Sequence, residues 1–249
     1  PVAPGTKNIT VGGAVASDVH GKNHHVDGSF GDHVIEILLI DGYGEIQKLS
    51  RSSNPKLFWA TIGGMGLTGV IIDVTFSLIS IDTPLIKVDT IKFNEIDKLM
   101  DYMVKADKEY KYSVAWIDSL SAKGRGILTC GDHLDLGENK ISEEELIYKN
   151  KQIAKAPSLI PNGILNRFTV RAFNEAWYRQ APKHKKNETQ TINQYFYPLD
   201  GIGNWNNIYG SKGFIQYQFV VPDNAASLIK FVLDNLRKNS APSFLTVLK

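Results

Sequence analysis

The sequence predicts an α+β fold in two domains, and two observations lead to this prediction. Up to residue 84 the chain is rich in Gly and β-branched residues, which form short runs between turns. After Pro84 the expected order becomes strand, helix, strand, strand, which is typical of an antiparallel sheet with helices on one side. We therefore expect a first domain over residues 1–84 and a second over residues 85–249.

The first domain is expected to contain three strands and one short helix. Lys56 to Thr61 predicts one or two helical turns, with Asn54 as the cap. Pro55 would take the first helical position, where a missing N–H is tolerated. The expected strands are Val34 to Leu39, Gly44 to Leu49 and Gly69 to Ile79.

The second domain is expected to begin with a strand from Leu85 to Phe93. Asn94 would then open an amphipathic helix whose apolar face carries Ile96, Leu99, Met100, Met103 and Val104. A second helix is expected at Asn224 to Leu236. Further strands are expected at Tyr112 to Ile117, Gly126 to Cys130, Gln190 to Tyr197, Gly213 to Val221 and Phe244 to Leu248. The charged stretches Gly137 to Lys155 and Ala181 to Asn187 are expected to be exposed loops.

Composition excludes several classes of function. The chain has 249 residues, 43% of them hydrophobic, so it can bury a core, and its net charge of +2 gives no basic field for nucleic acid. Cys130 is the single cysteine and has no internal partner. No apolar run reaches the roughly 18 residues of a spanning helix. We therefore expect a protein that is cytoplasmic or peripherally associated with a membrane.

A cluster of basic residues near position 185 allows two interpretations. Its members are Lys183, His184, Lys185 and Lys186. A charge run of this kind usually forms a solvated loop. The alternative is contact with an anionic lipid or phosphate surface, which would give the protein a peripheral contact with the membrane.

The segment from Thr10 to Gly31 is dense in small residues. Paired glycines after a short strand let backbone N–H groups approach a pyrophosphate or a flavin ring, because no Cβ intervenes. The pair Gly12-Gly13 does not extend to the dinucleotide fingerprint G-x-G-x-x-G. The stretch Gly63 to Gly69 resembles that fingerprint superficially, yet it should run into a strand and not open a helix.

Three histidines in this segment suggest a metal site, which the pattern does not support. His20, His24 and His25 stand among glycines that disfavour a helix, and no acidic ligand follows at a familiar offset. For His24, His25 and His33 a bond to local backbone is the ordinary alternative. A hydrolytic triad built on Ser17 or Ser29 with His20 lacks the G-x-S-x-G context. We therefore expect no metal and no hydrolase.

The combined motifs resemble one known family, the decaprenylphosphoryl-β-D-ribose 2-oxidases, which are FAD-linked oxidoreductases of the vanillyl-alcohol-oxidase type. In the first domain the resemblance lies in Gly12-Gly13, Asp18 to His25, Gly28 to Gly31, Leu57 to Thr61 and Gly63 to Val70. In the second it lies in Ser113 to Trp116, Pro161 to Gly163, Ala176 to Arg179, Tyr197 to Asp200, Trp205-Asn206 and Gly213 to Val220. It covers nearly the whole chain except the two charged loops.

The resemblance implies a fold and a set of site residues. Residues 1–84 would be the second half of a PCMH-type FAD-binding domain, and residues 85–249 a substrate-binding cap domain that is incomplete at its C-terminal end. The residues that would line a non-covalently bound FAD are Gly5, Thr6, Thr10, Gly12, Gly13, Ser17, Val19, Gly21, Asn23 and Val70. Those that would face the sugar phosphate are His20, Lys22, Tyr197, Gln216, Gln218 and Lys249. The catalytic base is expected beyond Lys249.

The resemblance also implies a reaction and partners. The ribose 2-hydroxyl of a polyprenylphosphoryl-ribose, a precursor of cell-wall arabinan, would be oxidised by hydride transfer to flavin N5. An NAD-dependent reductase would be a candidate partner. Two alternatives stay open: another FAD-linked sugar-alcohol or aldonolactone oxidase or dehydrogenase of the same superfamily, and a non-catalytic binding subunit.

Overall fold

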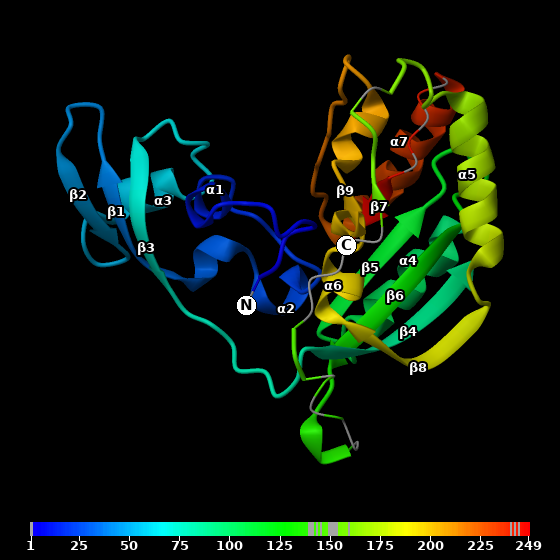
Figure 1. Cartoon of the computed structure of the whole chain (residues 1–249), viewed down its shortest axis with the longest axis horizontal. Helices are drawn as coiled ribbons and strands as arrows, with labels where there is room; N and C mark the ends of the chain where they lie inside the picture. Colours follow the sequence, from blue (N-terminus) through cyan, green and yellow to red (C-terminus); the bar gives the residue numbers. More distant parts are fainter. Residues whose placement is uncertain are drawn as a thin grey trace. The chain divides into compact units, whose positions relative to one another are not determined.

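The computed structural model of the protein has a mixed α+β fold with antiparallel sheets (Figure 1). The structure describes residues 2–138, 142, 144, 146–148, 154–158, 160–239, 241, 243 and 245–249. The chain forms two compact units. Unit 1 comprises Pro1–Pro84, Asp135–Tyr148 and Ile192–Asp200, and unit 2 comprises Leu85–Leu134, Lys149–Thr191 and Gly201–Lys249.

Unit 1 is built on a three-stranded antiparallel sheet in the order β2-β1-β3. The strands are β1 (Val34–Ile40), β2 (Ile46–Ser50) and β3 (Val70–Phe76). The helices α1 (Val11–Ala16) and α3 (Pro55–Thr61) contribute to one core with this sheet, in which Val15, Ile37 and Phe58 are fully buried. The predicted strands and the predicted helix at Lys56 to Thr61 are confirmed, with bounds shifted by a few residues.

The remaining elements of unit 1 are short. They are α2 (His24–Asp27), the 3-10 turns η1 (Phe30–His33), η2 (Leu136–Glu138) and η3 (Pro198–Gly201), and α6 (Ile192–Phe196). The two later stretches of chain, 135–148 and 192–200, thus group with the glycine-rich N-terminal segment.

Unit 2 contains a five-stranded antiparallel sheet in the order β10-β5-β6-β4-β8. Its strands are β4 (Leu85–Phe93), β5 (Tyr112–Ile117), β6 (Gly126–His133), β8 (His184–Thr191) and β10 (Thr246–Leu248). The helices α4 (Ile96–Ala106) and α7 (Ser227–Lys238) pack against it, and Leu99, Leu128 and Leu233 share the core.

Unit 2 also contains α5 (Arg167–Gln180), the parallel pair β7 (Ala154–Lys155) and β9 (Ile202–Gly203), η4 (Trp205–Tyr209) and η5 (Asp223–Ala225). The strand predicted at Leu85 to Phe93 is confirmed residue for residue. The helix predicted after Asn94 is also confirmed, although Val104 is exposed and does not belong to its apolar face. In the part of the chain that the structure describes, no helix combines the length and apolar character needed to cross a bilayer.

The glycine pair lies in a helix, whereas a strand was expected to precede it. Gly12 and Gly13 belong to the first turns of α1, and the Thr10 hydroxyl caps this helix by accepting the Gly13 N–H at 3.0 Å. Glycine disfavours helix by about 1 kcal/mol per residue relative to alanine. Burial of Ala14 and Val15 in the unit 1 core offsets this local preference.

The basic stretch near residue 185 is an edge strand, whereas a loop was expected from Ala181 to Asn187. Strand β8 begins at His184 and pairs with β4, and a bulge interrupts the pairing near Asp89. Asn187 adopts a left-handed backbone there, and its N–H donates to the buried Asp89 carboxylate at 2.8 Å. An edge strand has one side open to solvent, so a charged stretch can form it. Lysines at such an edge also discourage pairing with another chain.

Two further strand predictions are wrong. A strand was expected from Gln190 to Tyr197. In the structure β8 ends at Thr191 and the chain continues as α6, because Tyr195 and Phe196 are buried in unit 1. Residues 214–220 have no regular secondary structure, and Ile215, Tyr217 and Val220 are exposed. The backbone groups of a strand must pair with a neighbouring strand. The local sequence does not show whether such a neighbour is present. Phe244, the expected start of the last strand, lies outside the described residues.

Candidate functional site

The N-terminal part of unit 1 presents main chain with few side chains. Gly5 is exposed, and the position that a Cβ would take there is open space. Gly13 is also exposed, and a Cβ there would lie 3.1 Å from the Thr10 hydroxyl oxygen. At Gly12 the Cβ would lie 3.7 Å from the Ile71 side chain, so α1 packs closely on β3. Ser17, the C-terminal cap of α1, is exposed as well.

The loop that follows α1 is fixed by one carboxylate. Asp18 adopts a left-handed backbone with φ of 41°. Its side chain accepts the Ser29 hydroxyl at 2.9 Å and the Gly31 N–H at 2.8 Å, so the two ends of the loop are joined. The partly buried Val19 packs against the core of unit 1. Sequence reasoning quoted Asp18 within a motif and missed this structural role.

Gly21 and Asn23 are buried inside this loop. A Cβ on Gly21 would lie 2.5 Å from the Asn23 amide oxygen and 3.1 Å from the Ala3 carbonyl oxygen, so only glycine fits without a shift. The Asn23 amide donates to the Asp27 carboxylate at 2.6 Å. These contacts hold the loop in one conformation.

The histidines of unit 1 lie near one another. The rings of His20 and His24 have centroids 6.2 Å apart, and those of His24 and His25 lie 5.8 Å apart, both edge to face. His33 Nε2 lies 2.8 Å from the Asp27 carbonyl oxygen, which confirms the expected bond to local backbone for that residue. Among the described residues, no three His, Cys, Asp or Glu side chains form a group that could hold a metal ion.

A second anchor joins the N-terminal segment to residues 192–200. The buried Asp200 carboxylate accepts the Thr6 hydroxyl at 2.7 Å and the Lys7 backbone N–H at 2.7 Å. The Asn193 amide oxygen accepts the Lys7 ammonium at 3.3 Å and the Tyr148 hydroxyl at 2.6 Å. Thr6, assigned to the cofactor, is therefore held beside the segment that carries Tyr197, assigned to the substrate.

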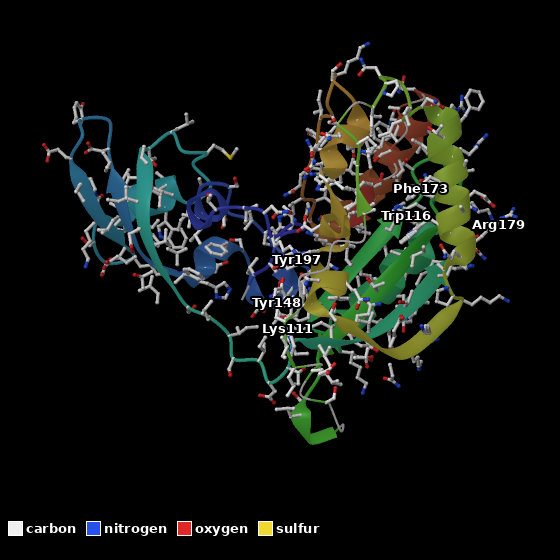
Figure 2. The ribbon with its side chains drawn as sticks, in the orientation of Figure 1. Lys111, Trp116, Tyr148, Phe173, Arg179 and Tyr197 are labelled. Atoms are coloured by element: carbon white, nitrogen blue, oxygen red, sulfur yellow. The ribbon has the colours of Figure 1, made fainter. Side chains whose placement is uncertain are left out.

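Lys22 reaches the same segment. Its ammonium donates to the Tyr195 carbonyl oxygen and lies 4.0 Å from the centroid of the Tyr195 ring. Tyr197 follows α6 directly and is half-buried (Figure 2). Burial raises the pKa of the Tyr197 phenol, and ionisation of Tyr148 and Asp200 nearby raises it further. The hydroxyl therefore stays protonated at neutral pH and can donate a hydrogen bond.

The other predicted site residues lie elsewhere. Val70 begins β3 and is exposed. Gln216 and Gln218 lie in unit 2, in the exposed stretch without regular structure, so the strand that was expected to carry them is absent. Lys249 follows β10, which pairs with β5, and burial lowers the pKa of its ammonium. Unit 1 thus brings Thr6, Lys22 and Tyr197 together, and unit 2 carries Gln216, Gln218 and Lys249.

The anchors themselves were not predicted as functional. Asp200 belongs to a motif that carries the family resemblance but implies no role for it, and no pattern points to Asn193 or Tyr148. Thr6 and Asp200 are 194 positions apart, so no local spacing could connect them. The available signal was a carboxylate that directly follows apolar residues in Tyr197-Pro198-Leu199-Asp200, since a buried acid requires hydrogen-bond donors.

Comparison with known proteins finds relatives that are oxidases. No family model matches it. It is 38% identical over 256 residues to the decaprenylphosphoryl-β-D-ribose oxidase of Mycolicibacterium smegmatis, a match that covers 100% of the chain and 55% of that protein. An uncharacterised protein of Streptomyces coelicolor is 31% identical over 81% of the chain and 58% of its own length. A probable L-gulonolactone oxidase of Arabidopsis thaliana is 39% identical over 31% of the chain and 15% of its own length.

The named relatives define the class of protein that the chain is similar to, that of the oxidases of sugars and sugar lactones. Within this class, the chain belongs to the decaprenylphosphoryl-β-D-ribose oxidase family, which confirms the resemblance found in its motifs. The chain spans between half and three fifths of the length of the two relatives that it matches over most of its length.

Proposed function

We propose that this chain is part of an FAD-dependent oxidoreductase that oxidises a secondary hydroxyl of a sugar, the ribose 2-hydroxyl of a polyprenylphosphoryl-ribose. The observation that carries the proposal is the 38% identity to an oxidase of that sugar over the whole chain. When bound, FAD would supply the acceptor for the hydride that leaves the carbinol carbon.

The exposed surface of unit 1 fits a flavin nucleotide. Gly5 offers bare main chain beside open space, which can approach a flat ring or a diphosphate without interference from a Cβ, and the exposed Gly13 lies next to the Thr10 hydroxyl. Ile9 precedes α1, Val11 lies in α1 and Val70 lies in β3. All three are exposed apolar side chains. Burial of such side chains against a ring would be favourable. The proposed FAD-binding residues are Gly5, Thr6, Thr10, Gly12, Gly13, Ser17, Val19, Gly21, Asn23 and Val70.

The proposed substrate residues supply the contacts that a sugar phosphate needs. Lys22 and Lys249 carry ammonium groups for phosphate or hydroxyl oxygens. His20 and Tyr197 would donate to sugar hydroxyls, and the raised pKa of the Tyr197 phenol further favours its neutral, donating form. Gln216 and Gln218 would fix further hydroxyls with their amides. We assign no proton acceptor for the hydroxyl within this chain.

An aldonolactone oxidase is the second candidate function. It is favoured by the match to the L-gulonolactone oxidase, which covers 31% of the chain. Both candidates require a flavin and a sugar-like alcohol, so they differ in substrate and not in cofactor. The match to the decaprenylphosphoryl-ribose oxidase covers the whole chain, which favours the first candidate.

The experiment is anaerobic reduction of the purified full-length protein. The proposal expects a yellow protein whose flavin bleaches on addition of decaprenylphosphoryl-ribose and stays oxidised with L-gulonolactone. Bleaching by the lactone alone would move the assignment to the second candidate. A colourless protein that retains a polyprenyl phosphate would indicate a binding subunit and contradict the proposed activity.

A further inference from the structure

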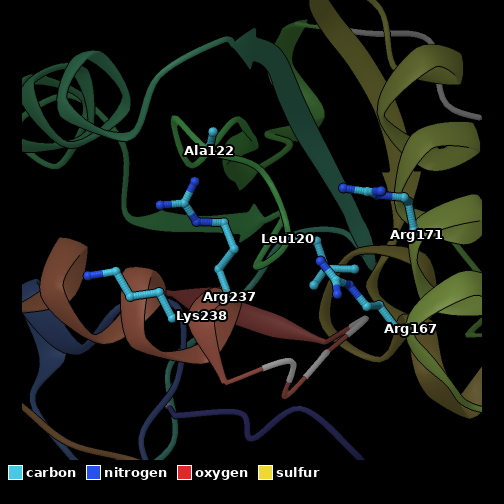
Figure 3. Close-up of a pocket in the computed structure, with 6 residues that line it drawn as sticks. All are labelled: Leu120, Ala122, Arg167, Arg171, Arg237 and Lys238. Carbon is cyan, nitrogen blue, oxygen red and sulfur yellow. The ribbon is translucent and has the colours of Figure 1, made fainter.

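A basic pocket lies in unit 2, separate from the residues discussed above. It has a volume of about 520 Å³ and is bounded by the loop between β5 and β6, the first turns of α5 and the last turn of α7 (Figure 3). Leu120 and Ala122 come from the loop. The other lining residues are cations: Arg167 and Arg171 from α5, and Arg237 and Lys238 from α7.

Two of the four cations in this pocket, Arg171 and Lys238, lack a compensating acid among the described residues. Its described lining includes no acid. Arg237 pairs with Asp234 of its own helix at 2.8 Å. Neither Arg171 nor Lys238 has an ion-pair partner in the described part of the chain. A concave site with charges of one sign concentrates the field and attracts counter-ions.

The acids of the neighbouring pocket are paired with other arginines. Arg125 pairs with Asp118 at 2.9 Å and with Glu175 at 2.6 Å. Glu175 also pairs with Arg179 at 2.5 Å. These two carboxylates line the neighbouring pocket, which shares Leu120, Ala122 and Arg171 with the basic one. Because their charge is spent on Arg125 and Arg179, it does not neutralise the basic pocket.

The wall of the pocket is held by a buried network. Asp118 is 3% exposed, and its carboxylate accepts the Leu120 N–H at 3.1 Å and the Asn174 amide of α5 at 2.7 Å. The Ser119 hydroxyl donates to the Ser243 carbonyl oxygen at 2.8 Å. The loop is therefore tied both to α5 and to the segment before β10. Such support keeps a binding site in a fixed geometry and reduces the entropy lost on binding.

We propose that this pocket binds a phosphate group. Arginine guanidinium groups present paired N–H donors that match the oxygens of phosphate, and lysine adds a point charge. Leu120 and Ala122 give the pocket an apolar side, and the exposed Phe168 lines the adjoining pocket. The ligand is therefore a phosphate ester or diphosphate, and both a free phosphate compound and a lipid headgroup provide this chemistry.

The test is binding to the full-length protein and to two variants. Arg171→Gln combined with Lys238→Gln removes the two uncompensated cations. Lys105→Gln, an exposed lysine of α4, removes one charge elsewhere on unit 2. Calorimetry with inorganic phosphate and with pyrophosphate tests a free ligand. Sedimentation with phosphatidylglycerol vesicles, against phosphatidylcholine vesicles, tests a headgroup.

The proposal expects the double variant to bind pyrophosphate, or to sediment with phosphatidylglycerol vesicles, at least tenfold more weakly than the wild type, with Lys105→Gln unchanged. The arm that shows this loss identifies the source of the phosphate. Flavin content should be the same in all three proteins, which separates this site from the proposed FAD site. Equal binding by the wild type and the double variant, or no binding of any probe by the wild type, would overturn the proposal.

Discussion

The two units reach a defined structure by different means. In unit 2, apolar residues repeat with the period of strands and helices, and they meet in one core around Leu99 and Leu128. In unit 1, the proposed site is held by polar contacts between distant segments, such as Asp200 with Thr6, and by glycines such as Gly21. Core substitutions should therefore act mainly on stability, and substitutions at the anchors mainly on the site.

The largest expected effect is on the core of unit 2. Leu128→Ala truncates a fully buried side chain in β6 and should lower the free energy of unfolding by about 2–5 kcal/mol, because it leaves a cavity. Val104→Ala on the exposed side of α4 is the control and should change stability by less than about 0.5 kcal/mol. Urea unfolding of the full-length protein measures both. Equal losses of unfolding free energy in the two variants would show that the core of unit 2 does not dominate its stability.

A smaller effect is expected at the anchor of unit 1. Asp200→Ala leaves the Thr6 hydroxyl and the Lys7 N–H without their acceptor and should cost about 1.5–3 kcal/mol, the range for hydrogen bonds to charged groups. Hydrogen exchange at residues 192–200 should become faster, and flavin content should fall. Asp82→Ala, an exposed carboxylate, is the matched control. Unchanged exchange in Asp200→Ala would show that the anchor does not hold this segment.

Two substitutions in unit 2 should affect turnover without loss of stability. Lys249→Met removes an ammonium whose pKa is lowered by burial, so the charged form is disfavoured and the melting temperature should not fall. Gln218→Ala alters an exposed side chain. If both contact substrate, kcat/KM should fall by a factor corresponding to about 1.5–3 kcal/mol in each. Normal kinetics in both variants would show that neither Lys249 nor Gln218 contacts the substrate.

The smallest effect concerns pH. Because burial raises the folded-state pKa of Tyr197, its contribution to stability is present below the unfolded phenol value of about 10 and is lost as pH rises through the higher folded value. Tyr197→Phe should therefore flatten the loss of stability above about pH 10. Tyr43→Phe, 94% exposed, should leave it unchanged. Urea titrations at several alkaline pH values compare the slopes, and identical slopes would contradict the burial of Tyr197.

The comparison also explains what could be predicted from the sequence. The extent of β4 and the apolar face of α4 follow from local patterns, and both were predicted almost residue by residue. The helix at Gly12-Gly13, the edge strand β8 and the irregular stretch 214–220 depend on what packs beside them, which no local pattern records. The site residues came from resemblance to a family. The Asp200 anchor needed the structure.

We propose that the glycine-rich surface of unit 1 holds a non-covalent FAD, and the flavin content of purified full-length protein tests this directly. We predict that acid precipitation releases FAD from the wild type. Gly13→Val should lack flavin, because a branched side chain would occupy the space of the cofactor, while most of unit 2 stays folded. Gly42→Val, where a Cβ meets open space, should keep its flavin. Full flavin content in Gly13→Val would show that Gly13 does not face the cofactor, and flavin that stays with the wild-type precipitate would show that it is covalently attached.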